Sequence, residues 1–330
     1  MSTYTTDGRS DIRDDFESVR DQQRRRLRGT TGESWAARAV RQVTGIVTAD
    51  PYPQQLTEAA AGVQGAVTTG RRVAVVGTRG GAGRTTTAAL LARVIGSLRT
   101  DPVTVIDAAG ARGTLALRLA PEQELPTGGE VLDAAGRAPA ALADLTGALA
   151  PAGRNLWAAR SRPGQDLDEL VVAVSRFCAV TLVDAPTPDA AGTGQPLAPF
   201  AGAHALLHVA PCTVAGLDDA RWLAGSGTTT PLLTALVDVQ PGAGLDVVAE
   251  ARQLDHDGVP ALPLRFDRHL ATGVEFDLSL LARTTRLQAT ALASALVRTA
   301  IGGVPVTTPA LGAPDAAPAA PGARPGSDGR

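Results

Sequence analysis

The sequence predicts an α/β fold, in which a mainly parallel, twisted sheet carries helices on both faces. Apolar residues make up 44% of the 330 residues, which is enough to fill one large core. Short apolar stretches alternate with helical windows, a pattern typical of strands that pair in parallel through right-handed helical crossovers. In such a sheet, ligands bind at the edge formed by the carboxyl ends of the strands.

The expected elements follow one another from residue 72 to residue 301. Strands are expected at 72–77, 103–107, 154–159, 179–184, 204–209, 232–238 and 260–264. Most intervals between them hold one helix, and helices are expected at 84–98, 166–176, 213–224, 244–255 and 280–301. We therefore expect one domain over residues 71–302, preceded by a helical segment over residues 35–70.

Both ends of the chain have the composition of disordered tails. Residues 1–34 are first acidic and then arginine-rich, and residues 303–330 are rich in proline, alanine and glycine, so neither can bury much apolar surface. The basic run from Arg24 to Arg28 could contact DNA, an anionic membrane or an acidic partner. A solvated tail explains the same run without any partner.

A glycine-rich turn is the strongest local signal for function. Residues 73–87 read V-A-V-V-G-T-R-G-G-A-G-R-T-T-T, an apolar strand that runs through the turn into a helix. Such a turn directs backbone N–H groups and the positive end of the helix dipole at an anion. The spacing follows G-x-x-x-x-G-K-[ST], with Thr78 in place of the first glycine and Arg84 in place of the lysine. The predicted phosphate-binding residues are Gly80, Gly81, Ala82, Gly83, Arg84, Thr85 and Thr86.

Two acidic residues follow strands that should end at the same edge of the sheet. Asp107 ends the expected strand 103–107, and Asp184 ends the expected strand 179–184. A hydroxyl such as that of Thr85 and a carboxylate such as that of Asp184 are oxygen groups of the kind that Mg²⁺ takes. The sequence therefore predicts a nucleotide site with Mg²⁺ at Thr85 and Asp184, and no other metal.

The loop resembles the deviant phosphate loop, K-G-G-x-G-K-[ST]-[ST], of the ParA/MinD family of dimerising ATPases. The resemblance implies a P-loop NTPase fold, ATP and Mg²⁺ as cofactors, and a homodimer that forms with ATP. It places Arg79 at the family's signature lysine, which reaches the partner's nucleotide. It also implies that Asp107, the first acid of a D-x-D motif, lies beside the γ-phosphate as a catalytic residue, and that Asp238 faces the adenine.

Two departures from the family pattern predict weak or absent hydrolysis. Arg84 keeps the charge of the expected lysine, but a guanidinium is a wide planar fork and an ammonium is a compact point charge. Ala109 replaces the second acid of the D-x-D motif, which in the family helps to position the attacking water. All 31 basic residues are arginine, and a GC-rich coding bias explains part of this, so the alternative that the two loop arginines are drift toward an allowed cation stays open. We therefore expect a pseudo-ATPase that still binds nucleotide but hydrolyses it slowly or not at all.

A narrower resemblance suggests a cellular role. Residues 266–278, the helical stretch up to 301 and residues 35–45 look like parts of the MinD-like proteins associated with type VII secretion in high-GC Gram-positive bacteria. The resemblance covers residues 35 to 301. It implies a protein partner in secretion or in the positioning of a cargo.

Two other readings of the sequence stay open. The glycine turn could be a dinucleotide fingerprint with Asp107 on a ribose hydroxyl, although the glycines do not spell G-x-G-x-x-G. The chain could also be a non-catalytic interaction module that has lost the ability to bind nucleotide.

The sequence predicts a cytoplasmic protein. Cys178 and Cys212 lack metal-binding spacing and fit reduced packing residues, and no apolar run reaches the roughly 18 residues of a membrane span.

Overall fold

The computed structural model describes residues 50–302, apart from 110–112, 122, 163, 187–199, 201 and 243. The predicted tails at 1–34 and 303–330, the arginine run from Arg24 to Arg28 and residues 35–49 of the expected helical segment lie outside the described residues.

Within the described residues, the core is one sheet of eight strands. The strands are β1 (Arg71–Val76), β2 (Val103–Asp107), β3 (Ala150–Gly153), β4 (Leu156–Arg160), β5 (Val180–Asp184), β6 (Ala205–Pro211), β7 (Leu232–Val237) and β8 (Ala261–Leu264). Their order across the sheet is β3-β4-β2-β5-β1-β6-β7-β8. Every neighbouring pair is parallel except β3 and β4. The predicted fold class is confirmed.

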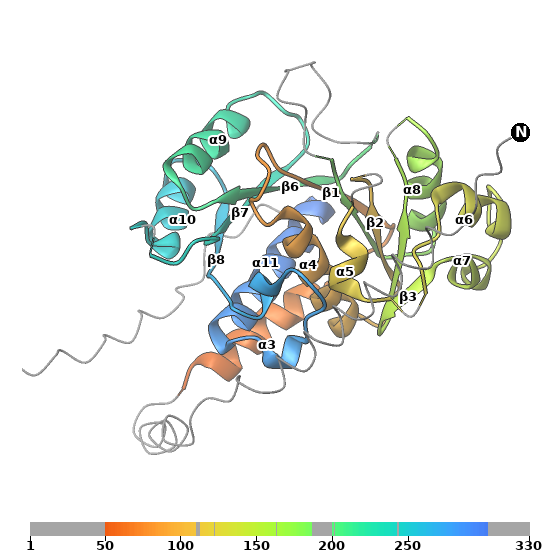
Figure 1. Cartoon of the computed structure of the whole chain (residues 1–330), viewed down its shortest axis with the longest axis horizontal. Coiled ribbons are helices and arrows are strands. Elements are labelled where there is room, and N and C mark those ends of the chain that lie inside the picture. Colours follow the sequence, from red (N-terminus) through yellow and green to blue (C-terminus); the bar gives the residue numbers. More distant parts are fainter. Residues whose placement is uncertain are drawn as a thin grey trace, which may run out of the picture.

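Helices cover both faces of this sheet (Figure 1). They are α3 (Tyr52–Val63), α4 (Arg84–Leu98), α5 (Leu115–Leu119), α6 (Gly128–Ala135), α7 (Leu142–Ala148), α8 (Leu167–Ser175), α9 (Val214–Ala224), α10 (Val247–His256) and α11 (Arg283–Ile301). Along β1, Val73 and Val75 pack with α4 and α11, whereas Ala74 and Val76 pack with α8. Because both faces are covered, the strands read as continuous apolar runs in the sequence.

The helix that precedes the sheet is fixed to the last helix of the fold. Helix α3 packs against α11 at a point where Gly62 meets Ser294, and a Cβ on Gly62 would lie 2.0 Å from the Ser294 Oγ. Nearby, the Arg283 guanidinium lies 4.2 Å from the centroid of the Tyr52 ring and forms an ion pair with Asp50 at 2.7 Å. Residues 50–63 are therefore part of the packed fold.

Between residues 115 and 153 the structure contains elements that the sequence does not predict. These are the short helices α5, α6 and α7 and the antiparallel strand β3. The strand expected at 154–159 begins instead at Leu156, because Asn155 adopts a positive φ of 50° in the turn from β3 to β4. The other expected strands and helices are present to within three residues at their ends.

Candidate functional site

The glycine-rich loop joins β1 to α4 at the carboxyl edge of the sheet. Gly81 and Gly83 have φ values of +79° and +84°, which glycine adopts at little cost. Gly83 precedes the first turn of α4, and no side chain caps that turn. The N–H groups of a first helical turn have no partners within the helix. The predicted arrangement for phosphate binding is therefore present in the backbone.

Arg84, the first residue of α4, forms an ion pair with Asp184 at the end of β5. The Arg84 Nε donates to the Asp184 Oδ1 at 2.8 Å, and the Asp184 side chain is fully buried while that of Arg84 is 11% exposed. Thr85, the next residue of α4, interacts with the same carboxyl group. Burial raises the pKa of Asp184, and Arg84 opposes that rise. The cation of the loop thus neutralises the acid that the sequence assigns to Mg²⁺.

Asp107 lies next to Asp184 because β2 and β5 are neighbours, and these two residues are in register. Its carboxylate accepts hydrogen bonds from the backbone N–H of Ala109 at 3.0 Å and of Leu115 at 3.2 Å. Burial, with the charge of Asp184, raises the pKa of Asp107 to about 6. Asp107 is only 3% exposed.

Arg118 of α5 is a second guanidinium at this site that the sequence reading missed. Its Nε donates to the Thr86 Oγ1 at 2.8 Å, and its Nη1 donates to the hydroxyl and the carbonyl of Thr114 at 2.6 and 3.0 Å. Burial lowers the pKa of Arg118, and the charges of Asp184 and Asp107 oppose that lowering. Within the described residues, Arg118 therefore adds a second positive charge that interacts electrostatically with Asp184 and Asp107.

Arg79 contacts its own chain, at Asp219 of α9. The two side chains share two hydrogen bonds, at 2.5 and 3.0 Å. The same carboxylate accepts a hydrogen bond from the Thr78 Oγ1 at 2.8 Å, and this oxygen lies 3.5 Å from the Nε2 of the fully buried His208. Burial lowers the pKa of His208 to about 4. Asp219 and His208 gave no signal in the sequence, because neither belongs to a motif.

Asp238 follows β7 at the same edge and is half-buried. Its neighbours Val237 and Val239 face the loop, since a Cβ on Gly83 would lie 3.6 and 3.8 Å from their Cγ1 atoms. The chain on either side of Asp238 therefore passes close to the loop. The contact of Asp238 with a base stays a prediction.

The fit of the site to Mg²⁺ depends on Asp184. One oxygen of this carboxylate is bonded to Arg84, and the other, Oδ2, is buried without a hydrogen-bond partner among the described residues. Within the described part of the chain, no group of three or more His, Cys, Asp or Glu residues could hold a metal ion. Thr85 and Asp184 lie together as predicted, but Arg84 already provides a positive charge there.

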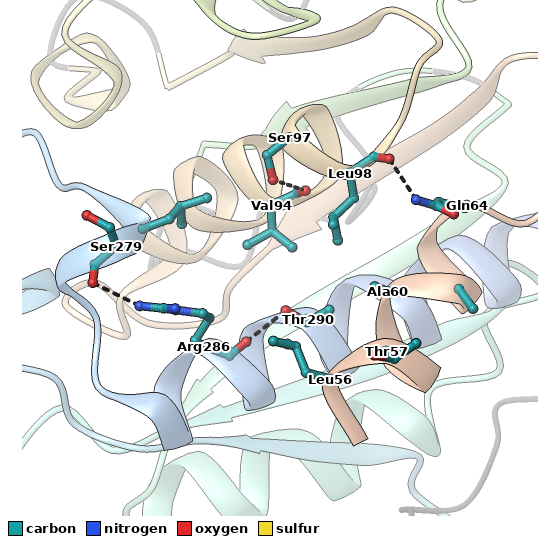
Figure 2. Close-up of a pocket in the computed structure, with 12 residues that line it drawn as sticks. Leu56, Thr57, Ala60, Gln64, Val94, Ser97, Leu98, Ser279, Arg286 and Thr290 are labelled. Carbon is teal, nitrogen blue, oxygen red and sulfur yellow. Dashed lines mark hydrogen bonds between the residues drawn. The ribbon is translucent and has the colours of Figure 1, made fainter. Parts of the chain in front are cut away.

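A separate hollow opens between α3, α4 and α11 (Figure 2). Its volume is about 530 Å³, and its walls include Leu56, Val94, Leu98 and, at one end, Arg286. None of the predicted site residues lines it.

Cys178 and Cys212 are free and buried, as the sequence predicts for packing residues. In the part of the chain that is described, no helix has the length and apolarity to cross a membrane.

Comparison with known proteins supports the fold. No family model and no curated protein matches this sequence. The ParA family ATPase of Chlorobium tepidum TLS superposes with a TM-score of 0.51 at 14% identity, over 66% of this chain and 97% of that chain. The chain has the fold of ParA and MinD. A chain of the MinC:MinD cell division protein complex of Aquifex aeolicus gives the same TM-score at 20% identity, over 67% of this chain and 93% of that one.

Proposed function

We propose that this chain is an ATP-binding dimerisation switch of the ParA/MinD type with weak or absent hydrolysis. The observation that carries the proposal is the meeting of the glycine loop, Arg84, Asp107 and Asp184 at the carboxyl edge of β1, β2 and β5. Unrelated glycine turns rarely coincide with an acid at the end of both companion strands. A ParA/MinD fold around this edge supports the same function.

In this proposal the polyphosphate binds to main-chain N–H groups of Gly80 to Gly83 and of the first turn of α4. Thr85 and Thr86 lie in that turn, and Asp238, whose neighbours Val237 and Val239 lie near Gly83, is the candidate contact for adenine. Thr85 and Asp184, the residues predicted for Mg²⁺, lie at the same edge, where Arg84 is already bonded to Asp184.

Hydrolysis should be weak because two groups that act on the transition state are altered. Ala109 carries no carboxylate to orient water, and its N–H is instead bonded to Asp107. Arg84 is hydrogen-bonded to Asp184 and would have to leave it to reach the γ-phosphate. Loss of one well-placed transition-state contact costs about 3 kcal/mol, or about a hundredfold in rate.

Dimerisation of two copies would then depend on whether nucleotide is bound. Arg79 is half-exposed at the loop and is the candidate to reach a partner's nucleotide. It must first leave Asp219, so ATP and dimerisation shift one shared equilibrium. The proposed role is in secretion or in the positioning of a cargo through a protein partner. We retain a cytoplasmic location in the proposal because both cysteines are free and buried.

Thermal unfolding of the full chain with candidate ligands tests this function. A ligand present at a hundred times its Kd stabilises the folded state by about 2.7 kcal/mol. We expect ATP to raise the Tm and NAD(H) to leave it unchanged. Stabilisation by NAD(H) alone would favour a dinucleotide-binding protein, and no response to either ligand would favour a non-catalytic interaction module.

A further inference from the structure

Among the described residues behind the glycine loop, two acidic and two basic side chains interact. Asp107 and Asp184 provide two buried carboxylates, and Arg84 and Arg118 provide two guanidinium groups that interact with them. Arg84 forms the closest of these contacts, 2.8 Å from its Nε to the Asp184 Oδ1. Arg84 therefore already supplies a positive charge to this buried carboxylate, whose Oδ2 has no hydrogen-bond partner among the described residues.

We infer that Arg84 serves as the resident counter-cation of Asp184, so that the loop binds the polyphosphate of a nucleotide without Mg²⁺. This inference rests on the proposed function, since it concerns the same site. The preferred ligand would be the metal-free nucleoside triphosphate. Mg²⁺ would then add little to its affinity.

Mg²⁺ would add little to the affinity because it would compete with Arg84 for the carboxylate of Asp184. A Mg²⁺ ion that used Asp184 would have to approach the Oδ2 atom, beside a guanidinium that already holds Oδ1. Like charges that share one buried acid repel each other. If Arg84 moved away to make room, the ion would have to replace both the hydrogen bond and the positive charge that the guanidinium gives to this fully buried carboxylate.

The sequence offers a direct way to change this competition. A lysine at position 84 would place a compact ammonium in the loop and would lack the Nε that reaches Asp184. Asp184 would then be available to Mg²⁺. In the Arg84→Lys variant, the affinity for ATP should therefore depend on the metal.

The test is the Kd of the full chain for ATP, measured by titration calorimetry in EDTA and in excess Mg²⁺. For the wild type we expect similar Kd values in the two conditions. For Arg84→Lys we expect Mg²⁺ to lower the Kd by about tenfold or more. Arg93→Lys is the matched control, because Arg93 is on the same helix but packs on Phe276 and donates to the Leu119 carbonyl; its two Kd values should stay similar.

Each outcome decides a different point. If the wild type binds ATP only with Mg²⁺, Arg84 yields Asp184 to the metal and the inference is wrong, although the proposed function stands. If the wild type binds ATP in neither condition, the proposed function itself fails, and the inference with it. Since the wild-type comparison needs no variant, poor folding of Arg84→Lys would leave the test decisive.

Discussion

Arg79 and Asp219 are 140 positions apart in the sequence and form a two-bond ion pair beside the glycine loop. The Arg79 Nε lies 2.5 Å from the Asp219 Oδ2, and the Arg79 Nη2 lies 3.0 Å from the Asp219 Oδ1. The pair lowers the pKa of Asp219. In this conformation, the residue expected to reach a partner's nucleotide is held by α9 of its own chain.

Replacing Asp219 with asparagine should therefore tighten ATP binding several-fold. The change removes a negative charge close to the phosphate site and releases Arg79, and opposite charges attract more strongly when a competing carboxylate is absent. Calorimetric Kd values for wild type and Asp219→Asn measure the effect. Asp257→Asn is the matched control, because Asp257 also pairs with an arginine of α9, Arg221 at 3.2 Å, but does not contact the loop. Equal Kd values for Asp219→Asn and wild type would show that the pair does not restrain the site.

Turnover should return only when both altered groups are restored. Phosphate release by the wild type should be very slow, and Arg84→Lys combined with Ala109→Asp should exceed either single change and raise the rate about a hundredfold or more. Arg84→Lys with Ala109→Asn is the control for size without charge. Single-turnover phosphate release is measured for the wild type, the two single variants, the double variant and the control. An unchanged double variant would mean that further parts of the site are lost.

Asp107 should make the fold less stable as the pH rises. Its pKa is 3.8 ordinarily and about 6 in the folded chain, so the folded state holds this proton more tightly than the unfolded state does. The resulting stability is complete below about pH 4 and is lost as the pH rises through about 6, to a total of about 3 kcal/mol. Asp107→Asn should remove that decline from the free energy of unfolding in urea. Parallel curves for variant and wild type between these pH values would refute the assignment.

His208 should act in the opposite direction over a similar range. Burial lowers its pKa from 6.5 to about 4, so its contribution to stability is present above about pH 6.5 and is lost as the pH falls through about 4. A His208→Gln variant should therefore lose the rise of stability with pH and reveal the fall due to Asp107. Urea unfolding over the same pH range measures the slope. A steeper rise than that of the wild type would contradict this account of His208.

Most strands of the fold could be predicted from the sequence because they are buried on both faces of the sheet. A run such as residues 103–107 has no polar face, so its length and its spacing from α4 identify it. The stretch from 115 to 153 was not readable in the same way, since α5, α6 and α7 have only five, eight and seven residues. One signal was available there: Thr127 and Glu130 form a capping box at the start of α6.

The site could be located from the sequence, but its pairings could not. Arg84, Asp107 and Asp184 each adjoin the end of a strand, so parallel pairing alone places them at one edge. The acceptor of the Arg84 hydrogen bond depends on the orientation of α4 relative to β5. Asp219 and Arg118 lie within helices whose facing positions only the packed structure defines.

Titration calorimetry of the full chain with ATP and GTP, with and without Mg²⁺, tests most directly the claim that the glycine loop binds a nucleoside triphosphate. We expect a saturable heat with ATP that is lost in Gly83→Val, because φ at this position is +84° and a branched side chain cannot adopt it without strain. The absence of heat with every adenine and guanine nucleotide, in both metal conditions, would contradict it.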